Sequence, residues 1–327
     1  MDSSTVRSAL ISLVLPAHNE EGNVPTIYSE ICGILAAMPY QIELIFVDDG
    51  SSDATAVRVR ELDSSPGVVV RLIRFSRNFG HQAALLAGLH AARGAAVITM
   101  DCDLQHPPQH LPQMITAWEQ GAKIVQMVRR HNAGTNWFKR TTSRSFYRVM
   151  AILSDSPVAK RAADYQLMDR QIVDYLLQIG DRQPFFRGMV SWLGFPATQI
   201  EYTAPERHAG QSSYNWRKMF NLALDGITSL SSKPLRLAFY LGLSAAGFCL
   251  IYIVFAVIAF LMGKSVPGWT SLIVTVVFLG GVQLICVGII GEYVARIYEL
   301  TRRLPPFIIA EDEKTEPPAA KARNAGE

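Results

Sequence analysis

Two carboxylates separated by one residue stand in the segment MDCDLQHPP, residues 100 to 108, where an apolar run ends. Asp101 and Asp103 suit a solvated turn, because Asp is a common turn residue and the following prolines stop a strand. On extended backbone, side chains two residues apart also point to nearly the same region. Hard divalent cations take oxygen ligands and often keep substrate phosphate oxygens in their shell. The pair therefore also suits a metal ion that holds a diphosphate.

Similar polar clusters follow three other apolar runs: PAHNE, DDGSSD and SRNFGH. Short apolar runs alternate with helical stretches, which predicts parallel strands joined by crossover helices. The expected strands are 10–15, 42–47, 68–75, 95–100 and 124–128, and the expected helices are 23–38, 54–63, 80–93 and 111–121. Ligands bind beyond the carboxyl ends of such strands, so one site can collect all four clusters. The first βα unit has neither GxxxxGK[ST] nor GxGxxG, which argues against a P-loop protein or a dinucleotide oxidoreductase.

The acidic residues in these clusters have two interpretations. Each could cap the helix that follows, and we assign that role to Asp53. We expect Asp48 and Asp49 to bind ligand instead, because a carboxylate accepts hydrogen bonds from a base N–H or a ribose hydroxyl. We do not expect His81 and His106 to be metal ligands, since neither belongs to an HxH or HxxxH motif.

Composition limits the class of protein. The chain has 327 residues, 49% of them hydrophobic, and a formal net charge of +3, which does not favour nucleic-acid binding. Its four cysteines form no CxxC pair, which fits a reducing cytoplasmic compartment. The N-terminus lacks the apolar core of a signal peptide.

Two uncharged runs, residues 237–262 and 271–291, are long enough to cross a bilayer. The segment GKSVPGWT separates them, so we expect a transmembrane hairpin; a buried helix pair in a soluble protein is the alternative. Lys and Arg flank the outer ends of the pair, against one Lys264 in the turn. This bias predicts a cytoplasmic location for the large N-terminal part and for both termini. The polar tail, 299–327, is predicted to be disordered.

Two further segments suit a membrane surface. Arg140, Arg144 and Arg148 share one helical face within a basic stretch, which favours an amphipathic helix on anionic lipid over a plain solvated face. Residues 211–236 combine aromatic, basic and apolar side chains, as an interfacial helix does; an ordinary packing helix is the alternative.

The motifs PAHNEE, VDDGSSD, SRNFGHQAALLAG, DCDLQHPP, DYQLMDR and LGGVQLICVGIIGEY, in this order, resemble the inverting family 2 glycosyltransferases. Within them the chain is most similar to the polyprenyl-phosphate (bactoprenol) glucosyltransferases, which share the plan of dolichol-phosphate mannose synthase. The resemblance implies an α/β nucleotide-diphospho-sugar transferase (GT-A) domain with a mostly parallel sheet. We expect this domain over 1–210, an interface region over 211–236 and the hairpin over 237–298.

The resemblance also implies roles for individual residues. Asp164 matches the family's proposed catalytic carboxylate, and Asp101 and Asp103 would hold Mg²⁺ or Mn²⁺ with help from Gln105. The expected nucleotide-sugar contacts are Pro16, His18, Glu20, Asp48, Asp49, Asp101 and Arg207. The expected acceptor-phosphate contacts are Arg129, Lys139, Arg140 and Ser143. Relatives often have Tyr at His18, Arg at Gln166 and Lys at Ser213, so any charge supplied at the last two positions must come from elsewhere.

Together these observations predict inverting transfer of a hexose to undecaprenyl phosphate at the cytoplasmic membrane face. Glucose from UDP-glucose is the favoured donor; GDP-mannose or a UDP-aminosugar is the alternative. A non-catalytic membrane scaffold of the same fold is a further alternative. The family resemblance and glycines in the second span, Gly280, Gly281 and Gly288, lead us to expect a homo-oligomer.

Overall fold

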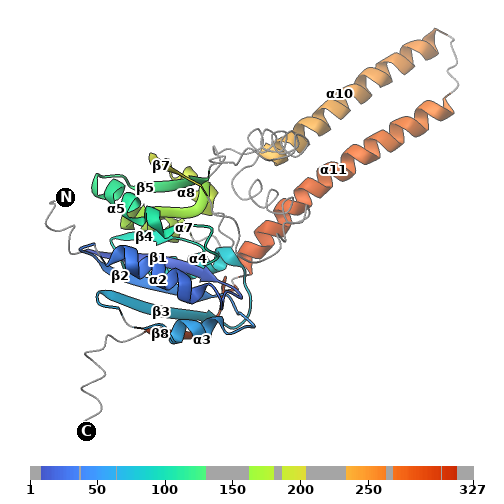
Figure 1. The fold of residues 1–327 in the computed structure, drawn as a ribbon. Helices are drawn as coiled ribbons and strands as arrows, with labels where there is room; N and C mark the ends of the chain where they lie inside the picture. Colours follow the sequence, from blue (N-terminus) through green and yellow to red (C-terminus); the bar gives the residue numbers. More distant parts are fainter. Residues whose placement is uncertain are drawn as a thin grey trace. The chain divides into compact units, whose positions relative to one another are not determined.

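The computed structural model describes residues 9–36, 38–63, 65–129, 162–179, 186–203, 233–262, 268–302 and 304–314. These residues fall into two compact units. The first contains all the described strands, and the second contains the two long C-terminal helices (Figure 1). The expected residues Lys139, Arg140, Ser143 and Arg207, and most of the expected interface region, lie outside the described ranges.

The described strands of the first unit form one sheet in the order β7-β5-β6-β4-β1-β2-β3-β8. Their bounds are β1 Leu10–Ala17, β2 Gln41–Asp48, β3 Val68–Phe75, β4 Ala96–Thr99, β5 Ile124–Arg129, β6 Ala162–Asp169, β7 Ala197–Tyr202 and β8 Ile309–Lys314. β1 pairs in parallel with β2 and β4, β2 with β3, and β5 with β7. β6 and β8 run antiparallel to their neighbours. The prediction of a mostly parallel sheet is confirmed.

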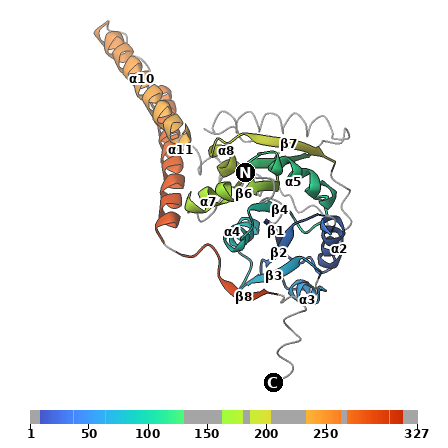
Figure 2. The ribbon, with the colours of Figure 1, turned by 90° about the vertical axis from the view of Figure 1, so that its left-hand side faces the viewer.

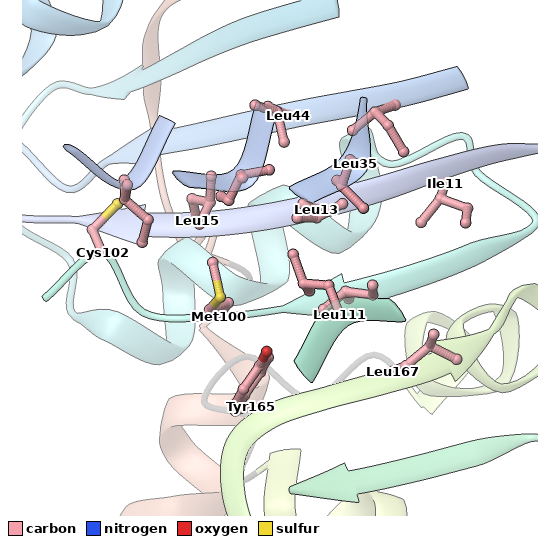
Figure 3. Close-up of a cluster of buried hydrophobic side chains, with 14 of the residues drawn as sticks. Ile11, Leu13, Leu15, Leu35, Leu44, Met100, Cys102, Leu111, Tyr165 and Leu167 are labelled. Carbon is pink, nitrogen blue, oxygen red and sulfur yellow. The ribbon is translucent and has the colours of Figure 1, made fainter. Parts of the chain in front are cut away.

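Helices cover both faces of this sheet (Figure 2). α2 (Val24–Leu35), α3 (Thr55–Arg60) and α5 (Leu111–Glu119) pack on one face, and α4 (His81–Ala91), α7 (Arg170–Ile179) and α8 (Phe186–Trp192) on the other. The central strands β1 and β2 are therefore buried on both sides, which explains their nearly continuous apolar runs. Figure 3 shows Leu13, Leu15 and Leu44 in the core on the α2 side.

α4 lies close to β1 because Gly88 has no side chain. A Cβ built at Gly88 would lie 2.1 Å from Cγ1 of Val14, a buried residue of β1. The helix is apolar on nearly all sides, since it packs between the sheet and α7. This close packing fixes the height of α4 above the sheet, and with it the position of the residues at the start of the helix.

The second unit contains α10 (Lys233–Leu261) and α11 (Trp269–Thr301), which pack against each other. Each contains an apolar stretch long enough to cross a membrane, Leu235–Ala259 and Val274–Ala295. Their large apolar side chains, such as Ile251 and Leu284, are mostly exposed in the isolated chain. Such a surface requires an apolar environment, as a lipid bilayer provides. α11 ends at Thr301, later than the expected boundary at residue 298.

The prediction of a disordered tail is wrong for residues 309–314. These residues form β8, which pairs with β3 along the sheet edge. The sequence AEDEK contains little apolar surface to indicate a strand. Its backbone is satisfied by β3, and its acidic side chains pair with Arg60, Arg71 and Arg74. The order of this segment thus depends on partners that are distant in the sequence.

The close contact at Gly88 predicts opposite effects for two glycine-to-alanine changes. Gly88→Ala should destabilise the protein by about 1–3 kcal/mol, because the new methyl group overlaps the buried Val14 side chain. Gly33→Ala, on the exposed face of α2 with no atom within 4 Å of the new Cβ, should be neutral or stabilising by up to about 1 kcal/mol. Thermal unfolding of the detergent-solubilised variants measures both. Equal effects at the two positions would contradict this account of α4.

Candidate active site

The register between β4 and β6 brings Asp101 and Asp164 together. Thr99 of β4 pairs with Gln166 of β6, and the two chains run antiparallel. Asp101 lies two residues beyond the end of β4, and Asp164 lies two residues before Gln166 on β6, so both carboxylates lie at the same end of this pair of strands. Asp164 is buried, whereas the Asp101 side chain is 32% exposed. Asp101 and Asp164 are far apart in the sequence. They lie near each other because β6 pairs antiparallel with β4.

His81 lies between these two carboxylates. Its Nε2 atom is 3.5 Å from Asp101 Oδ1 and 3.5 Å from Asp164 Oδ2. His81 is also the first residue of α4, and the aligned peptide dipoles of a helix give its N-terminus a partial positive charge. An imidazole N–H and a helix N-terminus both reduce the repulsion between two acids. Sequence reasoning left His81 out of the site, although SRNFGH stands directly after a strand, as the other clusters do.

Asp49 fixes the turn that leads into α4. Its two carboxylate oxygens accept hydrogen bonds from the backbone N–H of Phe79, at 2.6 Å, and of Gly80, at 2.9 Å. Burial raises the pKa of Asp49, and these two hydrogen bonds oppose that rise. Gly50 allows the turn to approach, since its φ is +62° and an added Cβ would lie 2.3 Å from the Arg77 carbonyl carbon. Asp49 therefore positions His81, and a direct contact with base or ribose stays a prediction.

The loops after β1 and β2 are joined by hydrogen bonds. Asn19, with φ of +58°, donates its backbone N–H to Ser51 Oγ, and its side-chain oxygen accepts from the N–H of Ser52. His18 Nδ1 lies 2.9 Å from the Asp49 carbonyl oxygen, and the backbone N–H of Glu20 donates to Thr55 Oγ1 at 2.8 Å. The two predicted nucleotide-contacting loops thus form one structure.

Several predicted residues of these loops have defined places. The His18 side chain is exposed, whereas Pro16 is buried within β1. Asp48 is 1% exposed and accepts the Ser51 N–H at 2.8 Å. Asp53 accepts the N–H of Thr55, the first residue of α3, but the N-cap position itself is occupied by Ala54, one residue after the predicted cap. The structure brings these loops to the same sheet edge as Asp101, and the predicted nucleotide contacts of Pro16, His18 and Asp48 remain predictions.

The loop that carries the two aspartates is held by aromatic side chains. His106 Nδ1 accepts the Asp101 backbone N–H at 2.9 Å, and its ring stacks on Tyr165 with centroids 5.0 Å apart. Tyr165, next to Asp164 on β6, donates its hydroxyl to the Pro107 carbonyl oxygen at 2.9 Å. His106 is therefore a positioning residue for the aspartate loop, a role that its position in DCDLQHPP alone did not reveal.

Within this loop, Cys102 packs into the core between two partly exposed carboxylates (Figure 3). Asp103 accepts the N–H of Gln105, and the Gln105 side-chain oxygen lies 3.5 Å from Arg129 Nη1. The Gln105 side chain thus contacts the guanidinium at the end of β5, while its backbone N–H donates to Asp103. Arg129 is exposed, as a residue that receives an anionic ligand should be.

Asp101 and Asp103 supply carboxylate oxygens, the type of ligand that hard divalent cations bind. Asp101 Oδ1 is buried and accepts no hydrogen bond within the described part of the chain. Burial raises the pKa of Glu20, and the negative charges of Asp103 and Asp101 raise it further, so the region attracts cations. Among the described residues, no three His, Cys, Asp or Glu side chains group to hold a metal. A cation on the two aspartates would take its other ligands from substrate oxygens and water.

Comparisons with known proteins identify the family of the chain. A model of glycosyl transferase family 2 matches residues 12–177, and a model of the GtrB C-terminal hairpin matches residues 233–297. The SfII prophage-derived bactoprenol glucosyl transferase of Shigella flexneri is 40% identical over 308 residues, 94% of this chain and 99% of its own. An uncharacterized glycosyltransferase of Bacillus subtilis (strain 168), YkcC, is 39% identical over 300 residues, 91% of this chain and 92% of its own.

A prophage bactoprenol glucosyl transferase homolog of Escherichia coli (strain K12) is 38% identical over 305 residues, 93% of this chain and 99% of its own. The sheet topology and the family match define a glycosyltransferase of the GT-A fold class. The chain belongs to glycosyl transferase family 2, with the GtrB type of C-terminal hairpin. The predicted family, fold and enzyme class are confirmed.

The raised pKa of Glu20 predicts a pH-dependent stability difference. An acid whose pKa is higher in the folded chain than its ordinary 4.5 costs stability once it ionises, because the folded chain then keeps an unfavourable charge. Without divalent cations, Glu20→Gln should therefore melt at a higher temperature than the wild type at about pH 8. The difference should shrink as pH falls through the raised pKa and vanish below 4.5. Glu30→Gln, on α2, controls for the loss of one charge; a pH-independent difference for Glu20→Gln would contradict the interpretation.

Proposed function

We propose that this protein transfers glucose from UDP-glucose to undecaprenyl phosphate, or a similar polyprenyl phosphate, with inversion at the anomeric carbon. The observation that carries the proposal is the placement of Asp164 beside Asp101 at the carboxyl edge of a family 2 sheet. The names of the bactoprenol glucosyl transferases that are about 40% identical over nearly their whole length support the sugar and the acceptor. The exposed apolar surface of α10 and α11 supports an acceptor that lies in a membrane.

The donor would lie across the loops after β1, β2 and β4. Predicted contacts are His18, Glu20 and Asp48 on the nucleotide side and Asp101 and Asp103 on the diphosphate side. Mg²⁺ or Mn²⁺, held by these two aspartates, would offset the charge that develops on the departing nucleotide diphosphate. Arg207, outside the described residues, is the predicted protein cation for the same charge. The aspartate loop is already ordered by His106, so little rearrangement is needed on binding.

The acceptor is a phosphate monoester, which is largely dianionic at neutral pH and scarcely needs a base. Catalysis then depends on aligning its oxygen with the anomeric carbon, opposite the departing diphosphate. Asp164 is placed to orient the sugar or to stabilise the positive charge that develops on its ring. Arg129 is the described member of the predicted acceptor-phosphate set, whose other members are Lys139, Arg140 and Ser143. These cations reduce the repulsion between two anionic substrates.

The membrane hairpin would hold the enzyme at its acceptor. The distribution of Lys and Arg around the two spans favours a cytoplasmic location for the catalytic domain and both termini. Nucleotide sugars are made in the cytoplasm, which suits this orientation. A homo-oligomer, with close helix contacts at glycines such as Gly280, remains part of the proposal.

Transfer assays with site variants test the catalytic assignment. Membranes that contain the protein should move label from UDP-glucose into a lipid-extractable product, and Asp164→Asn and Asp101→Ala should each lower kcat by roughly 10²-fold or more. Asp174→Asn, on an exposed part of α7, should leave kcat unchanged. Anomeric coupling constants measured by NMR should show opposite configurations in donor and product. Label transferred from GDP-mannose or a UDP-aminosugar instead would replace the donor, and no transfer from any donor would contradict the function.

Removal of divalent ions tests the predicted cation. Chelation should abolish transfer, and Mg²⁺ or Mn²⁺ should restore it. Two carboxylates and a diphosphate are all negatively charged, so a cation is needed to hold them together. Asp103→Asn should raise the concentration of metal needed for half-maximal activity, since one ligand charge is lost. Asp63→Asn, remote from the aspartate loop in the sequence, serves as the control. Full transfer in the chelated enzyme would contradict the assignment of Asp101 and Asp103.

A further inference from the structure

β8 is attached to the sheet edge by more than its backbone. It pairs antiparallel with β3, and the register places Glu311 opposite Arg74. Just before the strand, Phe307 stacks on Phe75 of β3 with ring centroids 5.1 Å apart. The Arg71 guanidinium binds Asp312 through two hydrogen bonds of 2.7 Å. This strand is therefore a specific part of the first unit, formed by residues that follow the hairpin in the sequence.

One residue of β8 is linked to the donor side of the site. Glu311 Oε1 lies 3.2 Å from Arg74 Nη1, and Arg74 Nε lies 3.3 Å from Asp48 Oδ2. Asp48 Oδ1 accepts the Ser51 N–H, and Ser51 Oγ accepts the Asn19 N–H at 3.0 Å. A continuous series of contacts thus runs from Glu311 to the loop that carries His18 and Glu20.

Arg74 matters in this series because Asp48 is 1% exposed. Asp48 Oδ2 is buried and, within the described chain, accepts no hydrogen bond of good geometry, so the nearby guanidinium is its source of positive charge. A buried carboxylate that loses its only counter-charge is strongly destabilised. Asp48 contacts Nε of Arg74 and Glu311 contacts Nη1, so the two acids together fix the guanidinium. Asp312 contacts Arg71, and Glu313 contacts Arg60, which Glu311 also contacts; neither Asp312 nor Glu313 contacts Arg74 directly.

We propose that β8 is a functional part of the donor site, in which Glu311 and Arg74 are positioning residues that hold Asp48 and the two nucleotide-side loops. This inference rests on the proposed function for its substrate, the nucleotide sugar. It assigns to the segment after the membrane hairpin a role in donor affinity. The role differs from simple edge protection, because Glu311 is the one acidic side chain of β8 that contacts Arg74 directly.

Kinetics of full-length variants in membranes separate these two roles. Glu311→Gln should raise the KM for the nucleotide sugar about two- to fivefold, as expected for a partly exposed ion pair, and leave the KM for the lipid phosphate unchanged. Asp312→Asn and Glu313→Gln are matched controls on the same strand and should leave both values unchanged. Arg74→Met should raise the donor KM roughly tenfold or more, because it isolates the buried Asp48. Adding Glu311→Gln to Arg74→Met should cause no further rise, since the pair acts through one guanidinium.

Amide hydrogen exchange tests the same inference without any substrate. Peptides that contain Asn19 and Ser51 should exchange faster in Glu311→Gln than in Glu313→Gln, because only the first change loosens the loops. Equal exchange and equal donor KM in Glu311→Gln, Asp312→Asn and Glu313→Gln would overturn the inference and leave β8 as a structural edge. Absence of transfer from every donor in the wild type would instead overturn the proposed function, while the exchange result would still decide the role of Glu311.

Discussion

The site depends on the concentration of negative charge at one edge of the sheet. Asp101, Asp103 and Asp164 lie at the ends of neighbouring strands, and Glu20 is near enough for the charges of Asp103 and Asp101 to raise its pKa. Like charges at such distances repel, and burial increases the cost. This cost explains why His81 and the N-terminus of α4 lie between Asp101 and Asp164. In the proposed function, the same negative charge would attract a cation and, through the cation, a diphosphate.

The surrounding structure keeps these charges in place. Asp49 uses both carboxylate oxygens to fix the turn that presents His81, and Gly88 lets α4 approach the sheet closely enough to deliver it. His106 accepts the Asp101 backbone N–H and stacks on Tyr165, and these contacts fix the aspartate loop. Residues whose motifs suggest substrate contact thus also serve as supports. A carboxylate that accepts two backbone N–H groups restricts a loop more firmly than a solvated side chain would, which suits a site that must be ordered before the substrate arrives.

Buried charge also links the donor side to the far edge of the sheet. Arg74 lies between Asp48 and Glu311, so the strand that follows the membrane hairpin contributes to the electrostatics of the first loops. In the proposed function, which combines a soluble donor with a membrane-bound acceptor, such a contribution would connect donor affinity with the segment that follows the hairpin. The exposed ion pairs of β8 are individually weak, and their combination with a backbone ladder and a stacked aromatic pair explains why the strand forms.

The sequence by itself determined the alternation of strands and helices, the mostly parallel sheet and the two apolar spans. It also indicated Asp101 and Asp103 as candidate site residues, because apolar periodicity and the position of polar clusters after strands are local signals. Asp164 was predicted from the family resemblance of its motif. Local signals carry no information on contacts between residues distant in the sequence, and the tertiary structure decided these contacts. The antiparallel course of β6 placed Asp164 beside Asp101, the turn held by Asp49 brought in His81, and the arginines of α3 and β3 ordered the acidic strand β8. Each of these depends on pairing between residues distant in the chain, where charge and register act only after the sheet has formed.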